Sequence, residues 1–223
     1  MKKDTRKKVI LFLVEGYSDK NSLGLILSRL IGECEVRFHI VQGDVTAAYN
    51  TTGLINRQIK SFLSRTHFKK SDILRVVQLI DTDGAFIDPS RVRYAPIKKL
   101  EYFDDHVDTP TPEAIIRRNE LKCESAKRLS EENYVFGIPY SIYYFSVNIE
   151  HVLHGVRGGL ESGDKVRFSY EFVERYAEHP HDFVELMRSE EVAAPGRYKE
   201  SWAYIFEDGH SLLRNSNFRL FFE

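Results

Sequence analysis

Acidic side chains at the ends of two apolar runs are the residues of this sequence best suited to chemistry. Glu15 follows the run 8–14, and Asp81 and Asp83 follow the run 73–80. In an extended chain, side chains two residues apart point to the same side, about 7 Å from each other. Carboxylates that converge in this way repel one another until a cation joins them. Because Mg²⁺ is typically held by carboxylates together with substrate phosphate, the pattern predicts metal-assisted phosphate chemistry.

The strands and helices expected around these acids predict an α/β fold. The run 8–14 lacks polar alternation, which is typical of a strand buried on both faces of a parallel sheet, and the run 73–80 is expected to form another strand. Further strands are expected at 35–41 and 140–147. Helices are expected from a cap at Ser18 to Gly32, at about 52–64 and at 112–131, with a turn at Gly43-Asp44. Right-handed crossovers would bring both acidic groups to the carboxyl edge of one sheet, where ligands bind.

The rest of the chain divides into an insertion and a C-terminal part. Four prolines and scattered charges in residues 85–112 indicate an insertion into the sheet. Residues 164–215 read as helical and polar, and 217–222 form an apolar tail. We therefore expect a catalytic α/β domain at 1–155, with a helical extension at 156–223 packed on it.

The two acidic motifs resemble those of a known domain. VEGYSD at residues 14–19, followed some sixty residues later by LIDTDG at 79–84, is similar to the Toprim domain. The form of the first motif most resembles the OLD-like (overcoming lysogenization defect) nucleases and the small Toprim proteins of bacterial antiphage defence. The resemblance covers residues 8–84 and, less fully, 140–155. It implies a Toprim-like Rossmannoid sheet of parallel strands flanked by helices.

The resemblance also implies roles for individual residues in a nuclease that cleaves DNA or RNA. Catalytic roles fall to Glu15, Asp81 and Asp83, with Lys20 as the nearest cation to neutralise transition-state charge and Lys165 and Lys199 as further candidates. We expect His151, beside Glu150, on the exposed surface of a helix. The implied ligands of Mg²⁺ or Mn²⁺ are Glu15, Asp19, Asp81, Asp83 and Glu150.

The same resemblance implies a partner. Small Toprim proteins of this kind work beside an ABC-type ATPase, and this chain carries no phosphate-binding loop of its own. The nearest match, beginning at Gly158, has Asp164 where that loop requires lysine. Any ATPase would therefore be a separate polypeptide. The chain is also too short to carry a tyrosine-bearing cleavage domain, so topoisomerase activity is not expected.

Charge is balanced overall but uneven along the chain. With 32 Lys and Arg against 33 Asp and Glu, the sequence is not a histone-like polycation. Residues 54–75 are strongly basic and could face the phosphates of nucleic acid, or could form a solvated helix face. The candidate nucleic-acid contacts in this segment are Arg57, Lys60, Arg65, Lys69 and Lys70.

Hydropathy and cysteine content indicate a cytoplasmic protein. The longest apolar run is far shorter than the roughly 20 residues that a membrane helix needs. No signal peptide is recognisable, and Cys34 and Cys123 are expected to be reduced thiols.

Two other functions remain open at this point. A phosphatase of the HAD type would use Asp81 as nucleophile and Asp83 as acid and base, but it would leave Glu15 without a role. A non-catalytic Toprim-like module would bind nucleic acid or a partner protein, with the apolar residues of 218–222 as one candidate interface.

Overall fold

The computed structural model describes residues 8–41, 46–48, 50–158 and 160–223, so the turn expected at Gly43-Asp44 lies outside the described part. The main sheet has five strands, and the α/β class expected from the sequence is confirmed. In spatial order the strands are β2 (Glu35–Ile40), β1 (Val9–Val14), β3 (Ile73–Asp81), β8 (Ile138–Phe145) and β7 (Tyr134–Val135).

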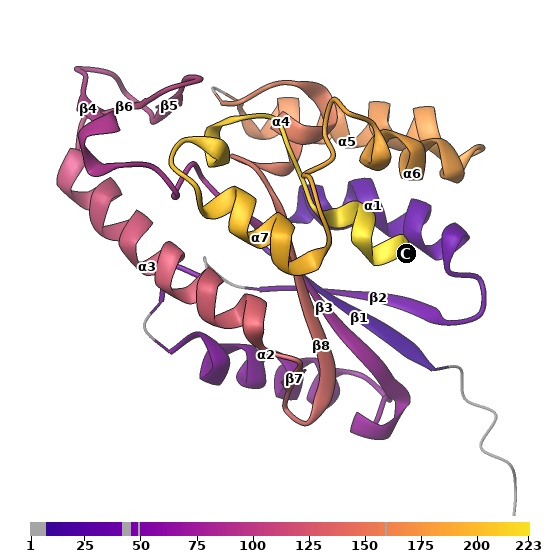
Figure 1. Cartoon of the computed structure of the whole chain (residues 1–223). Coiled ribbons are helices and arrows are strands. Elements are labelled where there is room, and N and C mark those ends of the chain that lie inside the picture. The colour runs from indigo at the N-terminus through magenta and orange to yellow at the C-terminus, as the bar shows by residue number, and fades with distance from the viewer. Residues whose placement is uncertain (1–7, 42–45, 49, 159) are drawn as a thin grey trace, which may run out of the picture.

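Helices cover both faces of this sheet (Figure 1). They are α1 (Tyr17–Leu30), α2 (Thr51–Arg65), α3 (Pro112–Glu131), α4 (Ile149–His154), α5 (Ser162–Tyr176), α6 (Pro180–Arg188) and α7 (Tyr198–Phe206). Short 3₁₀ turns lie at Lys70–Asp72, Pro89–Arg91, His210–Leu212 and Phe218–Phe222.

The four longer strands run parallel, as the alternation of strands and helices along the chain predicts. β1 pairs with β2 on one side and β3 on the other, and β3 pairs with β8. The antiparallel edge strand β7 was not expected, because two residues carry no readable periodicity. It joins β8 through Phe136 and Gly137, whose φ angles of 52° and 67° are those of a tight hairpin turn.

Each face of the sheet has its own hydrophobic core, as a parallel sheet buried on both sides requires. On one face, apolar side chains of α2, α3 and α7 pack against inward-facing residues such as Leu11 and Tyr144. On the other, α1, α5, α6 and the C-terminal turn pack against residues such as Phe12 and Phe145. Side chains of the C-terminal part therefore belong to both cores.

The N-terminus of α1 differs from the sequence expectation. Gly16, not Ser18, occupies the capping position, and its N–H donates to the Asp19 carboxylate at 2.9 Å. Because Asp19 reaches back to the residue before the helix, it supplies the cap acceptor from inside the first turn. The helix also ends two residues before Gly32, at Leu30.

The insertion after β3 contains a small sheet of its own, which lies at one end of the molecule in Figure 1. Its strands are β4 (Val92–Tyr94), β6 (Val107–Thr109) and β5 (Glu101–Tyr102), in that spatial order. Three strands of two or three residues are too short for their alternation to be recognised in a sequence.

Two further expectations concern membranes and cysteines. In the described ranges, no helix combines the length and apolar character needed to cross a bilayer. Cys34 and Cys123 are both free thiols, as the sequence predicts.

Candidate functional site

The acids singled out in the sequence gather around Asp81 at the carboxyl edge of the sheet. Burial raises the pKa of Asp81 well above its ordinary value, and the negative charges of neighbouring carboxylates raise it further. Those neighbours, in order of effect, are Asp19, Glu15, Asp83 and Glu150. These acids therefore lie close enough together at one edge of the sheet for their charges to act on Asp81.

Asp81 is the last residue of β3, and polar contacts hold it in place. One carboxylate oxygen accepts the N–H of Ile149 at 3.0 Å, which links the end of β3 to the first residue of α4. Its main-chain carbonyl accepts a hydrogen bond from Lys122 Nζ at 2.8 Å. These contacts fix the central carboxylate of the site from two neighbouring elements.

Asp19 lies in the first turn of α1 and is buried, with 8% of the residue exposed. Burial is the main reason that its pKa rises to about 6, and the negative charge of Glu150 adds to the rise. The hydrogen bond from Gly16 and the positive charge of Lys165 act in the opposite direction. Asp19 therefore holds its proton to a higher pH than an ordinary aspartate does, and a cation placed beside it would lower its pKa.

Asp83 follows β3 in a left-handed conformation, with φ of 50°, which aspartate tolerates better than most residues. Its N–H donates to the carbonyl of Val147 at 2.8 Å. Val147 has φ of 56°, an uncommon value for a β-branched residue. Strained backbone on both sides of this hydrogen bond is a feature that clusters at functional sites.

The Asp83 side chain is surrounded by donors from α3 and the insertion. Its carboxylate forms an ion pair with Lys122, whose side chain is 2% exposed. The hydroxyl of Tyr102 lies 3.5 Å from the other carboxylate oxygen. Arg118 donates to the main-chain carbonyl of Asp83 at 2.8 Å.

Glu150 enters the site from α4, directly after β8, and is almost fully buried. Lys165 Nζ of α5 lies 3.3 Å from one carboxylate oxygen. Even so, neither oxygen accepts a well-oriented hydrogen bond from the described residues. Burial disfavours the charge of Lys165, but Glu150, Asp81 and Asp19 outweigh it and raise the lysine pKa.

His151 is buried with 2% exposure, so the expectation that it lies on a helix surface is wrong. Its Nδ1 lies 3.3 Å from the carbonyl of Ser146, and Arg157 donates to its Nε2 at 3.1 Å. The carbonyl of Ser146 can only accept, so Nδ1 carries the proton, whereas Nε2 accepts from Arg157 and must be unprotonated, and this second contact requires the neutral imidazole. Burial lowers the pKa of His151 to about 4, in keeping with that state.

The sequence favoured Lys20 as the cation nearest the acids, but other lysines lie closer. Lys165 approaches Glu150 and Lys122 approaches Asp83, whereas Lys20 is exposed on α1. Lys122, Arg118 and Tyr102 were missed altogether. The spacing of Arg118 and Lys122 places them on one face of α3, but nothing in the sequence says what that face meets.

The basic segment lies away from the acids. All five of its candidate contacts are exposed. Lys60 and Lys70 lie over the ring of Phe136 in the β7–β8 hairpin, 5.6 and 5.0 Å from its centroid. Lys69 and Lys70 precede β3 and Asp81 ends it, so the nine residues of that strand place about 26 Å between them. Nucleic-acid binding by this surface stays a prediction.

No group of three or more Asp, Glu, His or Cys side chains within the described ranges is arranged closely enough to hold a metal ion. Two of the expected ligands are instead paired with lysines, Asp83 with Lys122 and Glu150 with Lys165. The two ammonium groups offset part of the negative charge that the acids concentrate at this edge.

Comparison of the chain with protein-family models, with curated proteins and with solved structures gives no significant match.

Proposed function

We propose that this chain is a divalent-metal-dependent nuclease of the Toprim type, which hydrolyses phosphodiester bonds in DNA or RNA. One observation carries the proposal: four other acids raise the pKa of the buried Asp81. Three of them follow parallel strands and one lies in the first turn of α1; they are Glu15, Asp83, Glu150 and Asp19. So many like charges in one place are costly to fold, and such clusters are found where a function requires them.

The donor set suits Mg²⁺ or Mn²⁺. All five acids offer oxygen ligands, and hard divalent cations prefer oxygen. The buried carboxylate of Glu150 has Lys165 Nζ 3.3 Å from one oxygen, but neither oxygen accepts a well-oriented hydrogen bond among the described residues, so both have lone pairs to offer a cation. The metal would be held by Glu15, Asp19, Asp81, Asp83 and Glu150. The ion pairs of Asp83 with Lys122 and of Glu150 with Lys165 would then be replaced by contacts with the metal.

The chemistry follows from these groups. When bound, a divalent ion would supply charge neutralisation and a water of lowered pKa for attack on phosphorus. The ammonium of Lys165, drawn to this edge by Glu150, would offset charge that develops on the phosphate oxygens. Lys122 and Arg118 would hold the Asp81–Asp83 segment in position through its main-chain carbonyls.

The biological setting rests on the motif resemblance alone. VEGYSD and LIDTDG are most similar to OLD-like nucleases and to small Toprim proteins of antiphage defence. We therefore propose a role in such defence, with a separate ABC-type ATPase as partner.

The test uses purified protein with single-stranded and double-stranded DNA and with RNA, in Mn²⁺, Mg²⁺ or EDTA, with and without a candidate ATPase. We expect cleavage that requires the divalent ion and falls by about 10²-fold or more in Glu15→Gln and in Asp83→Asn. Glu178→Gln, which changes an exposed glutamate away from the site, should cleave as the parent does.

Three results would reject the nuclease. Cleavage equal in the parent, Glu15→Gln and Asp83→Asn would identify a contaminant. Phosphomonoester hydrolysis with a trapped aspartyl-phosphate at Asp81 would favour the HAD-type phosphatase. Binding of nucleic acid or of the ATPase without cleavage under any of these conditions would favour the non-catalytic module.

A further inference from the structure

The turn from β8 into α4 has a backbone conformation that its residue type disfavours. Val147, in this turn, is fully buried and has φ of 56°. For a β-branched side chain this left-handed value is a clear outlier, and it persists only where the surrounding structure holds it. Hydrogen bonds to Val147 from other parts of the chain must therefore stabilise the turn.

Thr82, the residue between Asp81 and Asp83, supplies one of these hydrogen bonds from a buried position, with 1% of the residue exposed. Its side-chain oxygen accepts the N–H of Val147 at 2.9 Å and donates to the main-chain carbonyl of Ser211 at 3.4 Å. The N–H of Val147 donates to that carbonyl as well, at 3.3 Å. A single buried hydroxyl thus joins the end of β3, the β8–α4 turn and the 3₁₀ turn that contains Ser211.

Main-chain hydrogen bonds extend the same link. The last paired residues of β3 and β8 are Asp81 and Phe145. Beyond them, the N–H of Thr82 donates to the carbonyl of Phe145 at 3.0 Å, and the N–H of Asp83 donates to the carbonyl of Val147 at 2.8 Å. The two chain segments therefore stay side by side past the ends of their strands, and the side-chain bond of Thr82 adds to this pairing.

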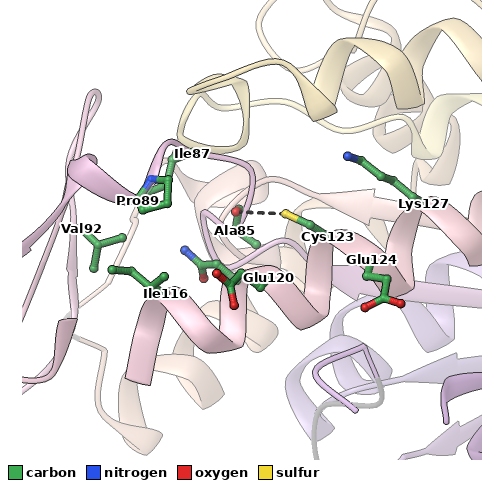
Figure 2. Close-up of a pocket in the computed structure, with 10 residues that line it drawn as sticks. Ala85, Ile87, Pro89, Val92, Ile116, Glu120, Cys123, Glu124 and Lys127 are labelled. Carbon is green, nitrogen blue, oxygen red and sulfur yellow. Dashed lines mark hydrogen bonds between the residues drawn. The ribbon is translucent and has the colours of Figure 1, made fainter. Parts of the chain in front are cut away.

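The segment that follows these residues is held from two further directions. The hydroxyl oxygen of Ser211 accepts the N–H of Phe86 at 3.0 Å. The N–H of Ala85 donates to the main-chain carbonyl of Thr82 at 2.9 Å. Figure 2 shows the carbonyl of Ala85 facing the thiol of Cys123 on α3, at 3.4 Å. The C-terminal 3₁₀ turn and α3 therefore both restrict the chain around Thr82.

The link matters for the acids because they lie on both of the joined segments. Asp81 and Asp83 are the sequence neighbours of Thr82, and Glu150 follows Val147 by three residues. The charges of Asp83 and Glu150 both raise the pKa of Asp81, so the acids repel one another across the link. Without contacts that oppose this repulsion, the two segments would move apart.

We propose that Thr82 is a positioning residue, whose hydroxyl holds Asp81 and Asp83 at the separation from Glu150 that a divalent cation requires. The role of the cation in this statement rests on the proposed function. The N–H of Ile149 donates to the Asp81 carboxylate at 3.0 Å, so it reports the separation of the two segments in the absence of metal.

The test compares Thr82→Val, which keeps the shape of the side chain but has no donor or acceptor, with Thr82→Ser, which keeps the hydroxyl. Thr109→Val is the matched control, because Thr109 is also buried and its hydroxyl accepts a main-chain N–H, that of Thr111, at 3.2 Å. In the metal-free proteins, NMR measures amide hydrogen exchange. We expect exchange about tenfold faster or more at Val147 and Ile149 in Thr82→Val, and rates close to those of the parent in the other two variants. The amides of β1 should keep their rates in every variant.

Mn²⁺ binding to the folded proteins is measured by calorimetry at a temperature well below every unfolding midpoint. We expect the Kd to be about tenfold or more higher in Thr82→Val, and within about threefold of the parent in Thr82→Ser and Thr109→Val. A role in packing alone would lower the unfolding midpoint of Thr82→Val and leave the Kd of the folded protein unchanged. The two roles are thereby separated.

Unchanged exchange at Val147 and Ile149 in Thr82→Val, or a Thr82→Ser variant that behaves like Thr82→Val, would overturn the proposal. So would an unchanged Kd in Thr82→Val when the parent binds Mn²⁺. If the parent binds no Mn²⁺, the nuclease proposal fails, and the exchange rates alone decide whether Thr82 holds the acids in place. Thr82→Ala, which places no methyl group against the N–H of Val147, serves with the same expected results if Thr82→Val does not fold.

Discussion

Lys122 forms an ion pair with the carboxylate of Asp83 although 39 positions separate them in the chain and the lysine side chain is only 2% exposed. The same ammonium donates to the main-chain carbonyl of Asp81 at 2.8 Å. One buried cation on α3 thus fixes both aspartates of the second acidic motif. A charge buried this deeply is tolerated only because its partners are in place.

Lys122→Met is expected to lower the free energy of unfolding by about 3 kcal/mol, because it leaves the Asp83 carboxylate without its buried partner. Urea unfolding in EDTA measures the change. Asp83→Asn in the Lys122→Met background should recover part of the loss, since it removes the uncompensated charge. Lys127→Met on the exposed face of α3 is the control and should stay within about 1 kcal/mol of the parent. An unaltered midpoint for Lys122→Met would contradict the pairing.

Asp81→Asn is expected to stabilise the metal-free protein at pH 8 more than at pH 5. Burial and four neighbouring acids raise the pKa of Asp81 above its ordinary value of 3.8, so the folded state holds the proton more tightly than the unfolded state does. The free energy of unfolding of the parent therefore falls as pH rises from 3.8 through the raised pKa of Asp81, and the uncharged asparagine avoids this loss. The asparagine oxygen can still accept the N–H of Ile149. Urea unfolding at both pH values tests this, with Glu178→Gln as control.

If the acids hold a metal, Mn²⁺ should make the parent more stable than Asp81→Asn, the reverse of the order expected without metal. We expect the ion to raise the unfolding midpoint of the parent and to raise that of Asp81→Asn much less, because binding to the folded state adds to stability. Equal stabilisation of the two proteins would show that the ion binds elsewhere.

The His151→Gln variant is expected to differ from the parent most at pH 7. The pKa of buried His151 is lowered from 6.5 to about 4, so its neutral ring favours the folded state above pH 6.5, and that contribution is lost as pH falls toward 4. The difference in unfolding free energy between parent and variant should therefore narrow, by up to about 3 kcal/mol, between pH 7 and pH 4. His179→Gln, which changes an exposed histidine, should show no such narrowing; the same narrowing in both would disprove the assignment to His151.

Lys165→Met is expected to reduce cleavage about 10²-fold, whereas Lys20→Met should change it less than about threefold. The two lysines should differ because Lys165 Nζ lies 3.3 Å from the carboxylate of Glu150 at the acidic edge, whereas Lys20 is exposed on α1. Because the Lys165 side chain is 44% exposed, the loss of stability should be small, about 1 kcal/mol or less. Single-turnover rates in Mn²⁺ compare the two variants. A larger effect at Lys20 would restore the cation first expected from the sequence.

The sequence by itself determined the sheet and the meeting of the acids. The uninterrupted apolar run 9–14 and the largely apolar run 73–80 are typical of strands covered on both faces in a parallel sheet, and parallel strands end at a common edge. Glu15 and Asp81, each at the end of such a run, were therefore bound to come close. This inference needs only the order of strands and helices along the chain.

Only the tertiary structure decided which other side chains reach that edge. Lys122 and Lys165 look like any other helix lysines in the sequence, and their roles depend on how α3 and α5 pack against the sheet. The same is true of His151, which is buried on the short helix α4 although the sequence predicts an exposed position. Periodicity along a chain fixes which face of a helix is buried, but the partner of a polar side chain on that face depends on helix packing across the whole fold.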